Sequence, residues 1–391
     1  MCNKQRVLIV HNYYQVPGGE DSVVANEKKM LEDHGHKVFM YTRHNDEIKE
    51  MGLLKKIMIP FNTIYNFKTK REIEKIVREN KIDVVHVHNT LPLISPSVYA
   101  GAKKAGAKVV QTIHNFRLLC PAATFVKNNK ICEECINQSL MCAIKGRCYR
   151  NSLIQTIICV LMLKINRIIG SYNKVDKYIA LTDFNKDKLK KIIDEDKILI
   201  KPNFIKDNSN VKIKNEDERK YFMFLGRLDK LKGIDKLIIA WKDIRNEELI
   251  VVGKGPEEEK IKEYINENQI NNVKLLGFKE KKEVIELLSY AKALIVPSQW
   301  YEGFPMTIVE ALSVGTPIIT TDIGNIKDVG EKSLGTIRTT SSNMWSKEII
   351  NAYDANKLKI KILEARKTYE EYYSEKQNYL SILNIYERNN N

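Results

Sequence analysis

The feature that most constrains the fold of this sequence is a regular alternation of short β-branched runs with longer segments of helical periodicity. Strands separated by helices in this way predict parallel sheets with helices on both faces. In the first part of the chain the expected strands are Val7–Tyr13, Val38–Thr42, Val84–His88, Lys108–His114 and Lys177–Thr182. After a polar stretch the alternation restarts, with strands expected at Tyr221–Leu225, Leu249–Gly253, Lys274–Gly277, Ala293–Pro297 and Pro317–Thr321. We therefore expect an α/β protein of two doubly wound, Rossmann-like domains, with ligands bound at the carboxyl ends of the strands.

The length of the chain agrees with two domains, and its net charge indicates what kind of partner it binds. The 391 residues exceed one ordinary domain, and a hydrophobic fraction of 43% excludes intrinsic disorder. The net charge of +15 predicts anionic partners, such as phosphorylated substrates, an anionic membrane face or nucleic acid. The longest apolar stretch, Leu153–Leu163, is shorter than the roughly 20 residues that span a bilayer. Because no signal-peptide pattern opens the sequence, we expect a cytoplasmic protein.

Two basic side chains follow the first strand of the second domain, in the segment Gly226-Arg227-Leu228-Asp229-Lys230-Leu231-Lys232-Gly233. Arg227 offers a planar fork of donors and Lys232 a compact mobile charge, a combination that suits a diphosphate. A solvated basic turn is the alternative. After the next strand, Gly253 and Gly255 allow a flat or anionic ligand to approach the backbone closely, or they form a plain Gly-Pro turn.

The most informative motif is Glu302-Gly303-Phe304-Pro305-Met306-Thr307-Ile308-Val309-Glu310, which follows an expected strand. Pro305 suits the first turn of a helix, and the free amides of Gly303–Thr307 would point outward at its positive end. Glu302 in the loop can accept sugar hydroxyls, and Glu310 within the helix can bind the two hydroxyls of a ribose. The alternatives are a capping carboxylate for Glu302 and an exposed helix residue for Glu310.

Taken in order, these motifs together with Val273-Lys-Leu-Leu-Gly-Phe resemble the retaining family-four glycosyltransferases of the GT-B fold. The resemblance implies that Arg227 and Lys232 bind the donor diphosphate, that Glu302 contacts the transferred sugar and that Glu310 holds the nucleotide ribose. It implies a donor site made by Gly18, Gly19, Arg227, Lys232, Gly253, Gly255, Gly303, Phe304, Pro305, Met306, Thr307 and Glu310. The loop Ile326–Gly335 is reduced relative to the family pattern, which affects the edge of the nucleotide pocket.

The resemblance continues into the first domain. Gly18 and Gly19 precede an expected helix, where their amides can form a phosphate nest and Asp21 can cap the helix. The resemblance implies that this loop touches the distal phosphate and the acceptor, and that His114 contacts the donor sugar as a catalytic residue. Asn115 follows His114 where the family often has Asp. His86 and His88 point to one face of a strand, and without a clear third ligand we expect His86 to be a hydrogen-bonded core residue.

A cysteine-rich segment, residues 120–150, interrupts the first domain. Cys132 and Cys135 have the spacing of a metal knuckle, and with Cys120 and Cys148 they could complete a four-thiolate zinc site. The alternative, which we favour, is a loop of unmodified thiols near the acceptor site. A subset of the family that builds bacterial surface polysaccharides carries the same cysteine arrangement.

Two segments could meet a membrane. Met51–Tyr65 mixes apolar residues with lysines, and Leu153–Ile169 has an apolar body edged by basic residues. A basic amphipathic helix can lie on an anionic leaflet, and a core helix is the alternative for Leu153–Ile169. We therefore expect a cytoplasmic protein with peripheral contact at the inner face of the membrane.

We predict an acceptor-binding domain at residues 1–205 and a nucleotide-sugar-binding domain at residues 216–372. A C-terminal helix within residues 373–391 is expected to pack back on the first domain. The resemblance implies a metal-independent, retaining hexosyltransferase that needs no cofactor. It would move sugar from a nucleotide-diphosphate sugar to a glycan or polyprenyl-linked acceptor in surface polysaccharide biosynthesis. The departing phosphate oxygen would itself deprotonate the acceptor on the same face. An inert scaffold and a basic nucleic-acid-binding protein are the alternatives, and dispersed positive charge argues against nucleic acid.

Overall fold

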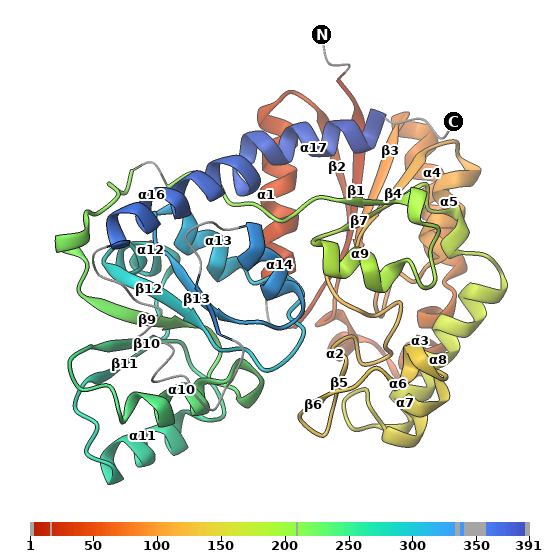
Figure 1. The fold of residues 1–391 in the computed structure, drawn as a ribbon. Helices are drawn as coiled ribbons and strands as arrows, with labels where there is room; N and C mark the ends of the chain where they lie inside the picture. The colour runs from red at the N-terminus through yellow and green to blue at the C-terminus, as the bar shows by residue number, and fades with distance from the viewer. Residues whose placement is uncertain (1–3, 16–17, 209, 333–336, 340–356, 388–391) are drawn as a thin grey trace. The chain divides into compact units, whose positions relative to one another are not determined.

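The structure is a computed structural model that describes residues 4–15, 18–208, 210–332, 337–339 and 357–387. The chain forms two compact units (Figure 1). Unit 1 comprises residues 1–127, 132–202 and 378–391, and unit 2 comprises residues 128–131 and 203–377. Among the described residues, no helix combines the length and the apolar character that crossing a lipid bilayer requires.

Unit 1 is built on a parallel sheet of six strands in the order β2-β1-β3-β4-β7-β8. The strands are β1 (Arg6–Tyr13), β2 (Lys37–His44), β3 (Val84–Asn89), β4 (Lys108–Thr112), β7 (Lys177–Ala180) and β8 (Ile198–Ile200). Every residue of the central strand β3 is buried, as a parallel strand covered on both faces requires. The strand predicted to reach His114 ends at Thr112, so His114 lies in the loop that follows β4.

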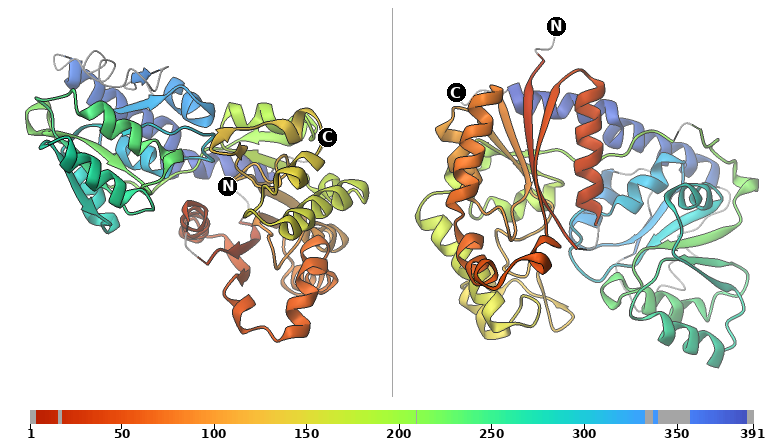
Figure 2. Two further views of the ribbon diagram at one scale, coloured as in Figure 1. Left: turned by 90° about the horizontal axis from the view of Figure 1, so that it is seen from below. Right: turned by 180° about the vertical axis from the view of Figure 1, so that it is seen from behind.

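The helices of unit 1 cover this sheet, and Figure 2 shows α1 running alongside its strands. They are α1 (Gly19–Asp33), α2 (Glu47–Glu50), α3 (Leu53–Ile64), α4 (Phe67–Asn80), α5 (Ser97–Lys104), α6 (Glu134–Asn137), α7 (Met141–Gly146), α8 (Leu153–Ile168), η1 (Tyr172–Lys174), α9 (Asp183–Leu189) and η2 (Glu195–Lys197). Short strands β5 (Val126–Lys127) and β6 (Lys130–Ile131) lie in the cysteine-rich segment. Helix α8 buries Cys159, Val160 and Leu163 in the core while Ile154 and Ile168 stay exposed.

The end of the chain completes unit 1. Helix α17 (Glu375–Glu387) belongs to this unit from Asn378 onward. The Tyr386 hydroxyl lies 2.8 Å from His86 Nδ1, and Lys108 Nζ donates to the Tyr386 carbonyl at 2.9 Å. Tyr379 adds a contact of 3.0 Å between its hydroxyl and His36 Nε2. The last helix therefore supplies hydrogen-bond partners that buried histidines of unit 1 need.

Unit 2 is a second parallel sheet, with the strand order β11-β10-β9-β12-β13-β14. Its strands are β9 (Tyr221–Leu225), β10 (Leu249–Val252), β11 (Val273–Gly277), β12 (Ala291–Val296), β13 (Ile318–Thr321) and β14 (Ile337–Thr339). Its helices are η3 (Glu216–Glu218), η4 (Lys230–Lys232), α10 (Ile234–Trp241), α11 (Glu258–Glu267), α12 (Lys281–Ser289), α13 (Met306–Ser313), α14 (Gly324–Lys332), α16 (Leu358–Thr368) and the π-helical turn η6 (Tyr369–Tyr373). The prediction of an α/β protein with two doubly wound sheets is confirmed.

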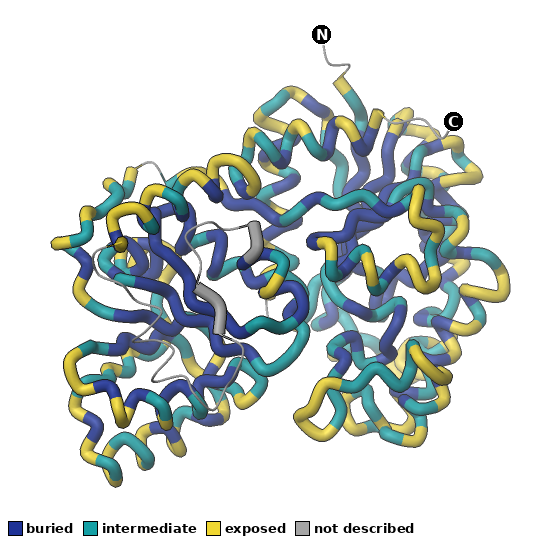
Figure 3. The backbone as a smooth tube through the Cα atoms, in the orientation of Figure 1, coloured by how far each residue is buried: buried dark blue, intermediate teal, exposed yellow. Residues whose placement is uncertain are grey.

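The core of unit 2 has one layer on each face of its sheet. Along β9, Met223 packs in one layer, and Phe222 and Phe224 pack in the other, because successive side chains of a strand point to opposite faces. Figure 3 accordingly shows the central strands as buried. Helices α12 and α13 pack on the Met223 side and α10 on the side of Phe222. With both faces of the sheet covered, the loops at the strand ends are where the sheet itself meets solvent.

Candidate active site

The loop between β9 and α10 carries Lys232 in a fixed position. Asp229 accepts a hydrogen bond from the Leu231 amide at 2.9 Å, which starts the short helix η4. Gly233 ends that helix in the left-handed region at φ 71°, and a Cβ there would lie 2.0 Å from the Pro297 carbonyl oxygen. Only glycine allows the loop to pass this close to the end of β12. The loop therefore delivers Lys232 to the residues that follow β12.

Glu302 is the centre of a hydrogen-bond network in the loop between β12 and α13. Lys232 Nζ binds both carboxylate oxygens, at 2.7 Å for Oε1 and 2.8 Å for Oε2. Oε1 also accepts from Ser298 Oγ at 2.6 Å and from Trp300 Nε1 at 3.0 Å. Glu302 is only 5% exposed. Within the described residues Oε1 thus has three donors, whereas Oε2 has a single donor and retains a lone pair for a ligand.

Asn325 supports the same loop from the first turn of α14. Its amide nitrogen donates to the carbonyl oxygens of Glu302 and Gly303, the second at 2.7 Å. Ser298, Trp300 and Asn325 are residues that the sequence analysis did not identify. Ser298 and Trp300 lie just beyond β12, so the rule that polar residues after strands line sites could have found them. Asn325 belongs to α14, which occupies most of the segment where the sequence analysis expected a loop, and no motif marks it.

The start of α13 differs slightly from its prediction. Pro305 is the N-cap residue and Met306 is the first helical residue, one position later than expected. The Ile308 amide donates to the Pro305 carbonyl at 3.1 Å, which leaves the amides of Met306 and Thr307 at the helix terminus. Burial raises the pKa of Glu310, which lies near Lys281. Arg227 is largely exposed, with its nearest carboxylate, Asp229, at 3.8 Å.

Gly253 and Gly255 have a structural role in addition to the predicted one. A Cβ at Gly253 would lie 1.9 Å from the Gly226 carbonyl oxygen, and one at Gly255 would lie 2.3 Å from the Leu228 carbonyl oxygen. These glycines permit a close approach of the loop after β9, and their predicted contact with a ligand stays a prediction. The Leu228 amide also donates to the Lys254 carbonyl at 3.0 Å. The two glycines therefore brace the loop that carries Lys232.

In unit 1 the glycine loop before α1 is partly occupied by the chain itself. The Gly18 amide donates to Asp21 Oδ2 at 2.8 Å, and Asp21 Oδ1 lies 2.7 Å from His11 Nε2. Asp21 is therefore the third helical residue of α1, and its carboxylate caps the helix by accepting from the amide of the N-cap residue, Gly18. The Gly18 amide is thus bonded to Asp21 in this structure, and the phosphate nest stays a prediction. The Gly19 amide remains at the positive end of α1.

His114 lies in the loop after β4, beside Asn115. Its Nε2 is 2.9 Å from His88 Nδ1, and the two rings are nearly coplanar, with an interplanar angle of 17°. Asn115 hydrogen-bonds the carboxyl of Glu20, whose pKa rises to about 8 because of its burial and the nearby charge of Asp21. The sequence analysis did not identify Glu20 as a member of this group. His114 and Asn115 line a cavity of about 60 Å³ in unit 1.

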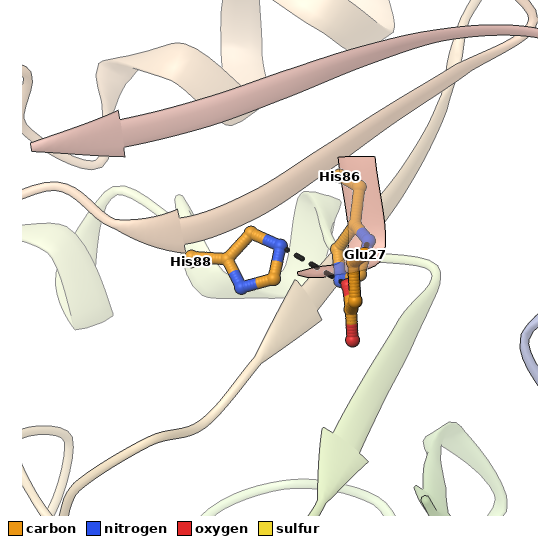
Figure 4. Close-up of side chains that lie close together, drawn as sticks. All are labelled: Glu27, His86 and His88. Carbon is orange, nitrogen blue, oxygen red and sulfur yellow. Dashed lines mark ion pairs between the residues drawn. The ribbon is translucent and has the colours of Figure 1, made fainter. Parts of the chain in front are cut away.

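Behind His114 lies a fully buried polar cluster that includes Glu27, His86 and His88 (Figure 4). Glu27 Oε2 is 3.5 Å from His86 Nδ1 and 3.4 Å from His88 Nε2. Lys201 donates to the other oxygen of Glu27. His86 is a hydrogen-bonded core residue, as predicted, because Thr112 Oγ1 lies 2.7 Å from its Nε2.

Two family models match the chain, and together they cover both units. The model described as Glycosyltransferase Family 4 matches residues 17–208, and the model described as Glycosyl transferases group 1 matches residues 205–372. The chain belongs to glycosyltransferase family 4. The family recognised from the ordered motifs is therefore confirmed, and nucleotide sugars are the donors of group 1 glycosyltransferases.

Individual relatives of this glycosyltransferase agree with the family assignment. An uncharacterized 42.6 kDa protein in the cps region of Klebsiella pneumoniae is 24% identical over 78% of this chain and 75% of its own length. An uncharacterized glycosyltransferase of Methanocaldococcus jannaschii is 26% identical over 83% of this chain and 81% of its own. The solved structure of Anabaena HepE in complex with UDP and glucose has a TM-score of 0.62 at 15% identity, covering 97% of this chain and 98% of that one. This likeness extends to the whole fold, which is GT-B.

The cysteine-rich segment of this glycosyltransferase contains free thiols in the structure. Among the described residues, Glu27, His86 and His88 are the group whose candidate ligand atoms all lie within 4.8 Å of one another, and no cysteine group meets that distance. Burial raises the pKa of Cys135 to about 12, and it also raises the pKa of Cys148. Cys120 and Cys148 lie near enough to Cys135 to raise its pKa as well, so the four-thiolate zinc site stays a prediction.

Proposed function

We propose that this glycosyltransferase moves a sugar, with retention, from a nucleoside-diphosphate sugar to a hydroxyl of a glycan or lipid-linked acceptor in surface polysaccharide biosynthesis. The observation that carries the proposal is the ion pair of Lys232 with Glu302. It places a mobile cation and a nearly buried carboxylate with one open lone pair beside the N-terminus of α13. These are the groups that a sugar diphosphate needs. The position of a relative in a cps region supports the polysaccharide context.

The ion pair suggests how the donor is received. In the ligand-free protein the charge of Lys232 is balanced by Glu302, at a side-chain exposure of 30% for the lysine. An arriving diphosphate competes for the ammonium, because a phosphate offers two or more charged acceptors. Glu302 stays in place through Ser298 and Trp300, and its Oε2 is then free to accept a sugar hydroxyl. Binding of the donor thus replaces the Lys232–Glu302 ion pair by two charge-assisted contacts, one from Lys232 to the diphosphate and one from a sugar hydroxyl to Glu302.

The same groups serve the leaving nucleoside diphosphate. Negative charge develops on the β-phosphate as the glycosidic bond breaks, and preorganised cations and amides stabilise it. Lys232, Arg227 and the amides of Met306 and Thr307 are the proposed donors of that field, and Glu310 is the proposed ribose ligand. With the diphosphate neutralised by these residues, we propose a reaction that needs no metal ion. The departing phosphate oxygen accepts the proton of the acceptor hydroxyl on the same face.

A cavity in unit 1 supports a lipid-linked acceptor. It has a volume of about 250 Å³, and its lining combines apolar side chains with a few polar ones, among them Ile59, Pro60, Ile158, Tyr149 and Arg150. Ile59 and Pro60 belong to α3, whose other face exposes apolar side chains next to two lysines. The exposed residues are Leu53, Leu54, Ile57, Met58 and Phe61, beside Lys55 and Lys56. We propose that this face of α3 lies on an anionic leaflet, at the inner membrane face, and that the cavity receives the acceptor.

A thermal-shift screen with UDP, GDP and ADP sugars tests the proposed donor class. A sugar nucleotide that binds the native state at 100 times its Kd should add about 2.7 kcal/mol to the unfolding free energy. The nucleotide that stabilises the protein is then supplied with lipid-linked and glycan acceptors, with and without EDTA. The anomeric configuration of the product, read by NMR, decides retention. No stabilisation by any of the sugar nucleotides contradicts the proposal and leaves the inert scaffold as the better interpretation.

A further inference from the structure

A chain of buried polar groups extends from Lys201 to His114 within unit 1. Lys201 donates to Glu27 Oε1, and Asn378 Oδ1 accepts from the same ammonium at 3.1 Å. Glu27 Oε2 lies 3.4 Å from His88 Nε2, and His88 Nδ1 lies 2.9 Å from His114 Nε2. The side chains of Lys201, Glu27 and His88 are inaccessible to solvent. Each of these groups must therefore form its hydrogen bonds with its neighbours, because water cannot replace a missing partner.

A metal ion is the first alternative for this cluster, since the oxygen and the two nitrogens have suitable spacing. The charges argue against it. Lys201 already neutralises Glu27, so a divalent cation would add two uncompensated positive charges in a fully buried site. His86 also has a hydroxyl at each ring nitrogen, from Tyr386 at 2.8 Å and from Thr112 at 2.7 Å. The ammonium of Lys201 occupies the electrostatic role that a metal would have.

The geometry of these contacts determines which ring nitrogen of His88 carries the proton. Glu27 Oε2 and His88 Nε2 are both buried without a hydrogen bond to any other group in the described residues, and they face each other. A ring lone pair beside a carboxylate oxygen is repelled, whereas a ring N–H is attracted. His88 therefore carries its proton on Nε2. Burial holds the pKa of His88 well below its ordinary value, so the ring is neutral and Nδ1 is an acceptor.

Because His88 Nδ1 is an acceptor, it determines which nitrogen of His114 is protonated. Only a proton on His114 Nε2 makes the 2.9 Å contact with His88 Nδ1 a hydrogen bond. Burial lowers the pKa of His114 to about 3, so this ring is also neutral and its Nδ1 bears a lone pair. Among the described residues Nδ1 has no hydrogen-bond partner, and His114 lines the 60 Å³ cavity with Asn115 and Arg117.

We propose that Lys201, Glu27 and His88 are positioning residues that hold His114 in one tautomer, so that its Nδ1 accepts a hydrogen bond from a substrate hydroxyl. The tautomer discriminates between substrate groups. A hydroxyl can donate to Nδ1, whereas a carboxylate, a phosphate oxygen or a carbonyl oxygen would place two acceptors together. Only the identity of that hydroxyl as part of a sugar rests on the proposed function. The positions of the protons on His88 and His114 follow from the residues of this protein and do not depend on the proposed function.

The proton order is measured directly in the wild-type protein. The chain has seven histidines, so a long-range ¹H–¹⁵N correlation spectrum of ¹⁵N-histidine-labelled protein at pH 7.5 is simple to read. His36 is an internal standard, because its Nδ1 accepts from the Gln5 amide at 3.1 Å and must be unprotonated. His88→Asn and His114→Asn assign the two signals. We expect Nε2–H tautomers for His88 and His114. An Nδ1–H or doubly protonated His114 overturns the proposal.

The role of the ion pair is tested in the double variant Lys201→Met/Glu27→Gln, which removes both buried charges together and so avoids an unpaired one. The amide that replaces the carboxylate can donate to His88 Nε2 or accept from it. We therefore expect His114 to lose its single tautomer and give signals of both. Lys127→Met/Glu134→Gln is the control. It removes a different ion pair, which lies in the cysteine-rich segment with an N···O distance of 2.9 Å, and it should leave the His114 signal unchanged. A double variant with a pure Nε2–H His114 shows that the pair does not set the tautomer.

Kinetics then connect the tautomer to recognition. With the donor identified by thermal shift, we compare that sugar nucleotide with its monodeoxy analogues. In the wild type one analogue should lose roughly tenfold in kcat/KM, and in Lys201→Met/Glu27→Gln this discrimination should largely disappear. Equal discrimination in both proteins overturns the recognition step. Absence of turnover with every sugar nucleotide defeats the proposed function and this step with it, while the spectra still decide the proton order.

Discussion

Replacement of Glu302 by Gln is the sharpest test of the site in unit 2, because it removes a charge and keeps the shape. The amide oxygen introduced by Glu302→Gln can still accept from Ser298 and Trp300, but the new NH₂ group takes the place of Oε2 and faces Lys232 as a second donor. Lys232 keeps its contact with the amide oxygen and loses the one with Oε2. The substitution therefore isolates the contribution of the open carboxylate oxygen.

The expected magnitudes follow from the contacts. One hydrogen bond to a charged group is lost and the ion pair loses its negative charge, so we expect a loss of about 2 kcal/mol in unfolding free energy. For a unit of this size that corresponds to a fall of about 4–8 °C in melting temperature. If Glu302 Oε2 receives the sugar hydroxyl, turnover should fall at least tenfold, or by about 1.4 kcal/mol in activation free energy.

Two assays separate these effects. Calorimetry gives the stability, and sugar transfer at saturating donor, below the melting temperature of the variant, gives the turnover. Glu283→Gln is the matched control, since this carboxylate also pairs with a lysine, Lys279 at 3.0 Å, on the surface of unit 2. It should leave both quantities unchanged. A Glu302→Gln variant with wild-type turnover refutes the assignment of Oε2 as a substrate ligand.

Three further predictions concern other parts of the chain. Gly233→Ala should displace the loop of Lys232, because its Cβ would lie 2.0 Å from the Pro297 carbonyl oxygen, and should abolish the thermal shift by sugar nucleotides. Leu54→Asp/Phe61→Asp should reduce flotation with phosphatidylglycerol vesicles without changing the melting temperature; unchanged flotation contradicts membrane contact through α3. Glu20 has a folded-state pKa of about 8, above its unfolded value, so the folded state binds the extra proton and stability should fall as pH rises from 7 to 8.5. Glu20→Gln should remove that slope in denaturant titrations, and a persistent slope assigns it elsewhere.

The meeting of Lys232 and Glu302 could be anticipated from sequence. Both lie in loops that follow strands, and the two strands, β9 and β12, are neighbours in the parallel sheet. Loops at the carboxyl ends of adjacent parallel strands converge, so residues 70 positions apart form an ion pair. The roles of Lys232 and Glu302 in catalysis stay predictions. Five strands of each sheet could be predicted from the alternation of β-branched runs with helical segments. The sixth strand of each sheet, β8 or β14, has three residues and was not predicted.

Other features could not be inferred because their partners are distant or ambiguous. A glycine motif indicates a close approach but not what approaches, and at Gly253 it is the backbone of Gly226. Glu27 lies within an amphipathic helix where a charged residue is ordinarily solvated. Its partner Lys201 is 174 positions away, in the segment after β8, and no local pattern connects the two. The buried chain behind His114 therefore required three-dimensional coordinates.

The placement of α17 has a consequence for the order in which the protein can be made. Tyr386 and Asn378 complete the surroundings of His86 and Lys201, which belong to the first unit to be synthesised. A nascent chain that has finished residues 1–202 still lacks these partners, and the whole of unit 2 is translated before they emerge. Domains generally fold as units in the order of synthesis. Here Lys201 and His86 lack the hydrogen-bond partners that α17 supplies until residues 378–387 have left the ribosome.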